Sequence, residues 1–176
     1  MNLIAAVSNN WGIGLRGELL FSIPEDMRHF KTLTQNKVVV MGHSTFKSLP
    51  NSKALKNRVN IVLSHNINLQ IDNAMVYNSV EQLLSAVSGF SSEDIFIIGG
   101  QAVYEQLINY CEFAYITKVN TRQDADRYFP KIEEMSNWKI QCRSSEKSYN
   151  DLTYTFVTYI NDNVLKPANS FKSDQS

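Results

Sequence analysis

Residues 94–107, DIFIIGGQAVYEQL, place an apolar strand directly before a Gly-Gly pair and a helical pattern. The run 95–98 has no polar member, which is typical of a parallel strand covered on both faces. After the glycines, Val103 and Leu107 recur at helical spacing and should face the core. Glycines at a strand end allow a ligand to approach closely, and the following helix N-terminus favours phosphate. The stretch predicts a nucleotide-binding junction, with a simple tight turn as the alternative.

Residues 38–49, VVVMGHSTFKSL, repeat the order of strand, glycine and helix. Ser44 and Thr45 can cap this helix and leave other N–H groups free for an anion, and His43 adds partial positive charge. Two such junctions in one small sheet are compatible with a dinucleotide lying across the strand ends. Neither of the two junctions follows the G-x-G-x-x-G fingerprint or the Walker phosphate loop.

Short apolar runs alternate with helical patterns along the rest of the chain, which predicts right-handed crossovers between parallel strands. Further strands are expected at 2–8, 37–41, 58–64, 74–77 and 113–119, and helices at 24–34, 43–49, 80–88 and 101–109. Residues 138–160 predict two antiparallel strands joined by a polar turn at 147–151. We therefore expect one three-layer α/β domain over residues 1–160, followed by a polar tail at 161–176. Its mostly parallel sheet should have about eight strands, with an antiparallel C-terminal edge strand and about four helices.

Residues 19–31, LLFSIPEDMRHFK, contain an acid beside an apolar helical stripe. Ser22 and Glu25 fit a capping box, so Asp26 should lie in the first turn, next to the stripe formed by Ile23, Met27 and Phe30. If burial dominates, the carboxyl keeps its proton to unusually high pH, which suits proton chemistry near neutrality. The alternative is a solvated acid that is favoured only by the helix dipole.

Residues 8–21, SNNWGIGLRGELLF, carry three glycines within one connection. This composition predicts an irregular, mobile loop that could close over a site and exclude water. A merely flexible surface loop explains the glycines equally well.

The composition excludes several classes of function. Seventeen basic and seventeen acidic residues cancel, so there is no electrostatic footprint for nucleic acid or an anionic membrane. Cys111 and Cys142 show neither metal-ligand nor disulfide spacing and are interpreted as reduced packing residues. His29, His43 and His65 are scattered, so no metal site is expected. The N-terminus has no basic leader and no run reaches membrane-spanning length, so we expect a cytoplasmic protein.

In this order and spacing, the segments resemble dihydrofolate reductase from about residue 2 to residue 160. The matching segments are AAVSNNWGIG (5–14), IPEDMRHFK (23–31), VVVMGHSTFKSL (38–49), RVNIVLS (58–64), IIGGQAVYE (97–105), AYIT (114–117) and DRYFP (126–130). The resemblance implies reduction of 7,8-dihydrofolate to tetrahydrofolate by hydride from NADPH, in support of one-carbon and thymidylate metabolism. It further implies a monomer whose partners are dihydrofolate and NADPH, without metal, nucleic acid or membrane.

The resemblance also implies roles for individual residues. Asp26 would promote substrate protonation, Thr117 would bridge Asp26 and the pterin amino group, and Arg58 would pair with the α-carboxylate of the glutamate tail. The apolar lining around folate would be Ile4, Ala5, Ala6, Met27, Phe30, Leu49, Leu55 and Ile98. The cofactor contacts would be Ala6, Ile13, Gly14, Gly42, His43, Ser44, Thr45, Leu63, Ser64, His65, Ile98, Gly99, Gly100, Gln101, Ala102, Val103 and Tyr104. The peptide between Gly99 and Gly100 is expected to be cis.

The chain departs from the family pattern at a few positions. Phe21, at a position that the resemblance makes catalytic, stands where tryptophan is usual, so an indole donor is absent. His43 stands where arginine is usual, which weakens the positive charge toward the cofactor's extra phosphate. A related reductase of riboflavin synthesis is one alternative, against which Asp26 and Arg58 argue. A folate- or nucleotide-binding module without catalysis is another, and Phe21 keeps it open.

Overall fold

The computed structural model describes residues 1–167 of the chain. The strands are β1 (Asn2–Val7), β2 (Gly12–Leu15), β3 (Glu18–Leu19), β4 (Val38–Gly42), β5 (Val59–Leu63), β6 (Met75–Tyr77), β7 (Ile95–Gly99), β8 (Phe113–Val119), β9 (Arg127–Tyr128), β10 (Trp138–Arg143), β11 (Lys147–Tyr149) and β12 (Leu152–Asn161). The α-helices are α1 (Pro24–Thr34), α2 (His43–Ser48), α3 (Val80–Val87) and α4 (Gln101–Leu107), and the 3-10 turns are η1 (Pro50–Ser52), η2 (Ser92–Asp94), η3 (Ile108–Tyr110) and η4 (Ile132–Glu134). None of the helices in this part of the chain combines the length and apolar character needed to cross a membrane.

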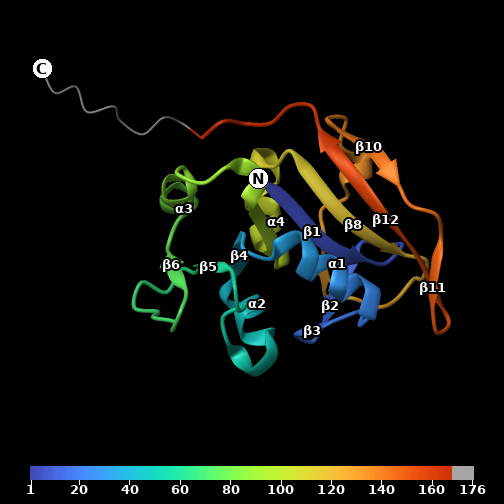
Figure 1. Ribbon diagram of the computed structural model, residues 1–176, viewed down its shortest axis with the longest axis horizontal. Helices are drawn as coiled ribbons and strands as arrows, with labels where there is room; N and C mark the ends of the chain where they lie inside the picture. Colours follow the sequence, from blue (N-terminus) through green and yellow to red (C-terminus); the bar gives the residue numbers. More distant parts are fainter. Residues whose placement is uncertain (168–176) are drawn as a thin grey trace, which may run out of the picture.

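The central sheet has the strand order β10-β12-β8-β1-β7-β4-β5-β6, with β11 pairing to β12 off this path. In Figure 1 the order runs from β10 at the right to β6 at the left. β8, β1, β7, β4, β5 and β6 are parallel, whereas β12 is antiparallel to β8 and β10. The predicted α/β domain with an antiparallel C-terminal edge is confirmed, because the bare apolar runs at β4 and β7 do form buried parallel strands.

Alternating side chains of the strands fill two apolar layers on opposite faces of the sheet. One layer packs α3 and α4 against the sheet through Leu83, Val103 and Leu107, which are all buried. The opposite face packs α1 and α2, with Ile23 in one cluster and Phe46 in another. Val103 and Leu107 therefore face the core as their spacing predicted. This arrangement gives the three expected layers.

Two local predictions were wrong, and the last strand runs past its predicted end. Residues 8–21 are not irregular throughout, because β2 and β3 form a hairpin that joins β9 in a separate three-stranded sheet. The expected turn at 147–151 is mostly strand, since residues 147–149 form β11 and pair with β12. The expected tail includes Asn161, which is still part of β12, and the N–H of Leu165 donates to the carbonyl of Asn109 at 2.8 Å. The rest of that tail, residues 168–176, lies outside the described residues.

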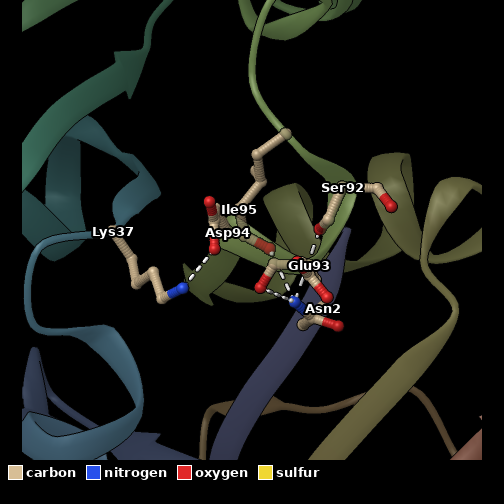
Figure 2. Close-up of polar contacts among 6 residues, drawn as sticks. All are labelled: Asn2, Lys37, Ser92, Glu93, Asp94 and Ile95. Carbon is tan, nitrogen blue, oxygen red and sulfur yellow. Dashed lines mark hydrogen bonds and ion pairs between the residues drawn. The ribbon is translucent and has the colours of Figure 1, made fainter.

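The amino ends of the parallel strands are tied together by polar contacts, of which the bond from Asn2 to Ile95 is buried (Figure 2). The side-chain Nδ2 of Asn2 in β1 donates to the carbonyls of Glu93 and Ile95, at 3.0 and 3.2 Å, just before and at the start of β7. Beside it, the ammonium of Lys37 pairs with the carboxylate of Asp94. Asn2 is 3% exposed, so this amide closes the edge of the core that lies away from the glycine junctions.

We expect Asn2→Ala to lower the free energy of unfolding by about 1–3 kcal/mol, because it leaves buried carbonyls without their donor. Urea denaturation would measure this change, with Asn9→Ala as the control, since Asn9 makes an exposed amide contact to Asn120. A stability equal to that of Asn9→Ala would contradict this account of the Asn2 amide.

Candidate active site

The start of α1 differs from the predicted capping box. The N-cap residue is Ile23 and makes no side-chain cap hydrogen bond, whereas Ser22 is exposed outside the helix. Glu25 does not reach back to the backbone, because its carboxylate binds the Lys147 ammonium at 2.8 Å and the Tyr154 hydroxyl at 2.6 Å. Pro24 in the first turn fixes the helix start without needing an N–H partner. Asp26 consequently lies in the first turn, as the sequence predicted, but a tertiary contact replaces the cap.

Asp26 is partly buried between α1 and the sheet. The hydroxyl of Thr117, in β8, donates to Oδ1 of Asp26 at 2.6 Å, and Thr117 itself is 2% exposed. Burial raises the pKa of the Asp26 carboxyl, while the Thr117 hydrogen bond and the charge of His29 oppose part of that rise. Desolvation thus outweighs the stabilisation of the charged form. The Thr117 contact and the partial burial disfavour the solvated alternative, and they favour a carboxyl that holds its proton to higher pH than an ordinary aspartate.

The apolar stripe of α1 is not covered by the core. Ile23 is buried, but Met27 is 49% exposed and Phe30 only partly buried. Of the helix residues, only Thr34 is fully buried. Beyond Ile23, the stripe therefore stays open and does not pack into the core. An apolar helix face left open beside a partly buried acid is the environment expected of a ligand-binding cleft.

The other predicted folate-lining residues divide between the two faces of the sheet. Leu49, Leu55 and Ile98 pack on the cluster around Phe46, on the face that carries α1 and α2. Ala6 packs on the cluster around Ile23, on the same face, and Ile4 shares that face by strand alternation. Ala5 instead packs against the core on the α3 and α4 face. Only the backbone of Ala5 remains available to the side of the sheet that carries Asp26.

Arg58 lies just before β5 and reaches the C-terminal end of α1. Its guanidinium donates to the Thr34 hydroxyl at 3.1 Å and to the carbonyls of Lys56 and Lys31 at 2.7 and 3.4 Å. The planar group is therefore held by several fixed acceptors, next to the exposed end of the helix that carries Asp26. Asn57, before it, has a φ of 57°, in the left-handed region that asparagine tolerates in turns.

The two glycine junctions lie side by side at the carboxyl ends of β4 and β7. Met41 pairs with Gly99, and the peptide between Gly99 and Gly100 is cis, as expected. A Cβ placed on Gly100 would lie 3.1 Å from the Thr45 hydroxyl, and one on Gly42 would lie 3.2 Å from Val103. Neither junction has room for a side chain without displacing its neighbour. The strand ends thus present closely apposed backbone, as a dinucleotide site requires.

The helix that follows the first junction is not capped by Ser44 or Thr45. The N-cap of α2 is Gly42, and it makes no side-chain cap hydrogen bond, because Ser44 and Thr45 lie inside the first turn. The N-cap of α4 is Gly100, again without a side-chain cap. The prediction of a capping role was therefore wrong. The first-turn N–H groups of both helices are left without the side-chain acceptor that a capping residue would provide.

The remaining predicted cofactor residues surround these junctions or lie on the small sheet. Tyr104 is buried, and its hydroxyl donates to the carbonyl of Ile4 at 2.7 Å, linking α4 to β1. The Gln101 side chain accepts from the N–H of Tyr128 at 2.9 Å. The other predicted positions are Ile13 and Gly14 in β2, Leu63 at the end of β5, Ser64 and exposed His65 after it, and exposed Ala102 in α4.

Phe21 is buried in the cluster that contains Ile23, Val119 and Tyr154, directly before α1. Its ring therefore packs beneath the first turn of the helix and offers no hydrogen-bond donor there. Sequence reasoning missed Lys147 and Tyr154, whose contacts to Glu25 join segments more than 120 residues apart. The prediction that Cys142 packs in the interior was wrong, because Cys142 is exposed, whereas Cys111 is buried.

Two hollows on the described surface lie away from Asp26. One, of about 570 Å³, is lined by Asn10, Arg122, Gln123, Asp124, Ala125 and Tyr128. The other, of about 320 Å³, is lined by His29, Tyr115, Ile116, Cys142, Arg143, Ser144, Phe156, Val157 and Thr158. Neither contains Asp26, Thr117 or a junction glycine. The candidate site is therefore identified by the Asp26–Thr117 pair and the apposed glycines, not by cavity size.

Known proteins of one family match this chain along almost its whole length. The model of the dihydrofolate reductase family matches residues 1–161. Dihydrofolate reductase of Bacillus subtilis is 32% identical over 168 residues, covering 94% of this chain and 97% of the relative. Dihydrofolate reductase type 9 of Escherichia coli is 33% identical, covering 94% and 95%. The solved structure of the reductase from Enterococcus faecalis, complexed with NADP(H) and RAB-propyl, has a TM-score of 0.82 at 27% identity, covering 92% of this chain and 95% of that one.

Proposed function

The chain belongs to the dihydrofolate reductase family, and from that premise we propose that Asp26 is the residue through which it promotes protonation of dihydrofolate. The enzyme reduces 7,8-dihydrofolate to 5,6,7,8-tetrahydrofolate with NADPH. The observation that carries the proposal is the contact between Asp26 and Thr117, at 2.6 Å, on the open apolar side of α1. An acid held there has the chemistry to favour proton transfer near neutral pH.

The proposed division of roles follows from the two side chains. The raised pKa of Asp26 makes proton retention less costly than for a solvated aspartate, so the carboxyl can favour a protonated ring nitrogen beside it. Thr117 fixes one carboxyl oxygen, which leaves the other free to face a pterin ring. Phe21 and Ile23 exclude water beneath the helix turn. NADPH, when bound, supplies the hydride.

The glycine junctions fit a dinucleotide cofactor. Side chains at Gly42 and Gly100 would occupy the space where the two strand ends approach one another. The uncapped first turns of α2 and α4 offer N–H groups, and His43 and Thr45 stand beside them. We infer that residues 42–45 hold the adenosine-side phosphates, together with Ser64 and His65. Residues 99–104 would hold the nicotinamide side, with Ile13, Gly14 and Ala6 covering it.

The substrate would lie between the exposed stripe of α1 and the apolar cluster at α2. Met27 and Phe30 supply one wall, and Leu49, Leu55 and Ile98 the other. Arg58 stands at the far end of α1, where its planar guanidinium suits a carboxylate. Asp26 lies at the N-terminal end of α1, and Arg58 lies against its C-terminal end. This placement matches a ligand with a ring at one end and a glutamate at the other.

We expect His43→Arg to lower the KM for NADPH about three- to tenfold while leaving the KM for NADH unchanged. The reason is that an arginine carries a full charge at neutral pH, whereas a histidine carries a partial one, and only NADPH has the extra phosphate. Steady-state kinetics with both nucleotides would measure the change, with Gln70→Arg as the control, because it adds the same charge at an exposed position outside the proposed site. Equal improvement for NADH would contradict a phosphate contact at position 43.

The activity is tested by mixing the pure protein with NADPH and dihydrofolate and following the ultraviolet loss of NADPH. Turnover above the blank is the expected result. Tight binding of both ligands without turnover would instead favour a catalytically silent binding module, the alternative that Phe21 keeps open. The riboflavin-pathway alternative predicts turnover only with the ribosylated pyrimidine substrate, and Asp26 with Arg58 opposes it.

We further propose that the enzyme works as a monomer in the cytoplasm. All of the proposed substrate and cofactor residues come from one chain, so no second copy is needed to complete the site. Both cysteines are free, which suits a reducing compartment. Light scattering of the purified protein would test the monomer, and a mass of twice 20.1 kDa would contradict it.

A further inference from the structure

The first turn of α1 is clamped to the C-terminal hairpin through Glu25. One carboxylate oxygen of Glu25 accepts from Lys147 in β11, at 2.8 Å, and the other accepts from the Tyr154 hydroxyl in β12, at 2.6 Å. Both partners come from the hairpin that extends beside α1 in Figure 1. The Lys147 and Tyr154 contacts hold the pKa of Glu25 below its ordinary value, so the carboxylate stays charged at neutral pH. We call Glu25, Lys147 and Tyr154 the hairpin clamp.

The hairpin clamp has one buried partner, Tyr154, whereas the Lys147–Glu25 pair is partly exposed. Tyr154 is 2% exposed and packs in the same cluster as Phe21, Ile23 and Val119, so its hydroxyl is fixed by the core. Burial and the Glu25 carboxylate raise the pKa of Tyr154 to about 12, so the phenol remains a donor across the physiological range. Lys147 stands 5.9 Å from the ring of Phe156, which in turn packs on His29 of α1. The clamp and this aromatic contact hold the same helix turn from two sides.

Glu25 is adjacent in sequence to Asp26, and the two side chains are fixed to neighbouring strands. Glu25 is held by β11 and β12, whereas Asp26 is held by Thr117 of β8. β12 pairs with β8, and Phe156 lies opposite Thr117 in that pairing. A shift of the first turn away from the hairpin would therefore move Asp26 relative to Thr117.

We propose that Glu25, Lys147 and Tyr154 are positioning residues, which hold the first turn of α1 so that Asp26 stays against Thr117 and withdrawn from water. This inference rests on the proposed role of Asp26 in substrate protonation. The hairpin clamp touches neither proposed ligand. The clamp therefore acts on the reaction only by holding Asp26 in position.

Loss of the hairpin clamp should change the pKa of Asp26 in the opposite direction to a change of nearby charge. The groups that interact with Asp26 are His29 on α1, Tyr154 on β12 and the neutral Thr117 on β8, while the adjacent Glu25 carboxylate interacts with Lys147 and Arg28. Removing the Lys147 cation, and so leaving Glu25 unpaired, would raise the pKa of Asp26 by electrostatics alone. Loosening the turn instead admits water to the carboxyl, and this lowers that pKa by more than the loss of the Thr117 hydrogen bond raises it, because burial is the largest cause of the shift. The sign of the change therefore separates positioning from charge.

The test compares Lys147→Met and Tyr154→Phe with Lys147→Arg, which retains the cation, and with Lys139→Met. The last variant is the matched control, because it also replaces a lysine by methionine and breaks an ion pair. That pair joins Lys139, on edge strand β10, to Asp162, and it lies outside the hairpin clamp. Each variant would be characterised by its kcat, its KM values, its thermal midpoint and the pH titration of the Asp26 carboxyl, followed by 13C NMR. The NMR titration reports the place of Asp26 whether or not Asp26 has the proposed catalytic role.

We expect Lys147→Met and Tyr154→Phe each to lower kcat about three- to tenfold, with the KM for NADPH unchanged. The pKa of Asp26 should fall in both, while Lys147→Arg and Lys139→Met should remain within about twofold of wild type in kcat. An unchanged Asp26 titration in Lys147→Met and Tyr154→Phe would overturn the proposal. So would a rise confined to Lys147→Met. A lowered pKa with unchanged kcat would uphold the positioning and refute the role of Asp26 on which it rests.

Discussion

Asp26→Asn should lower turnover at neutral pH by about 10²-fold or more, the range contributed by a positioned proton-transfer group. Asparagine keeps the size of the side chain and can still accept from Thr117, but it has no proton to give or relay. The loss should be greatest at alkaline pH and smallest at acidic pH, because bulk acid then protonates the substrate directly. The rate of hydride transfer, followed by stopped-flow absorbance across the pH range, measures the effect.

The control for this variant is its stability. Folding raises the pKa of Asp26, so protonation favours the folded state; this contribution is present at low pH and is lost as the pH rises through the raised pKa. Asparagine carries no charge and avoids that loss, so the variant should melt at or above the wild-type temperature at neutral pH. A rate loss that is the same at every pH would argue against proton chemistry, and a lowered thermal midpoint would indicate a damaged fold instead.

Arg58→Leu should weaken dihydrofolate binding by about 10- to 100-fold and change NADPH binding by less than about twofold. Removing a charge-assisted, bidentate contact to a carboxylate has an effect of this size. The guanidinium also donates to Thr34 and to the carbonyls of Lys56 and Lys31, so the leucine variant loses a local anchor as well. Equilibrium binding measured by fluorescence would give both constants.

Two comparisons separate the carboxylate contact from the anchor. Arg58→Lys keeps the charge and loses the planar fork, so its affinity for dihydrofolate should lie between those of wild type and Arg58→Leu. A pteridine ligand that lacks the glutamate tail should bind wild type and Arg58→Leu equally. If the tail-free ligand also binds the leucine variant weakly, Arg58 supports the structure of the site without contacting the glutamate.

Much of the architecture could be predicted because its signals are local. The bounds of α1 and β8 follow from apolar periodicity, and the glycines after β4 and β7 mark where the backbone must approach closely. The start of α1 shows the limit of such signals. Ser22 and Glu25 fit a capping box in sequence, but a lysine and a tyrosine of the distant hairpin bind Glu25 more strongly than the local backbone does.

Fewer features of the candidate site than of the fold could be predicted from local sequence patterns. The raised pKa of Asp26 follows from the position of an acid beside an apolar stripe, although that stripe is largely open and not buried in the core. The contact to Thr117 was expected only from the family resemblance, because no local pattern relates residues 91 positions apart. The side-chain direction of Ala5 and the pairing of β2, β3 and β9 depend on strand register, which composition does not encode.

The central claim is that Asp26 is a carboxylic acid withdrawn from water and held by Thr117 against the sheet. A 13C NMR titration of the Asp26 carboxyl, assigned by comparison with Asp26→Asn, measures this directly in the protein without ligands. The account predicts a pKa above the ordinary aspartate value of about 3.9. A carboxyl that titrates at or below that value would show a solvated or ion-paired aspartate and would contradict the proposed proton chemistry.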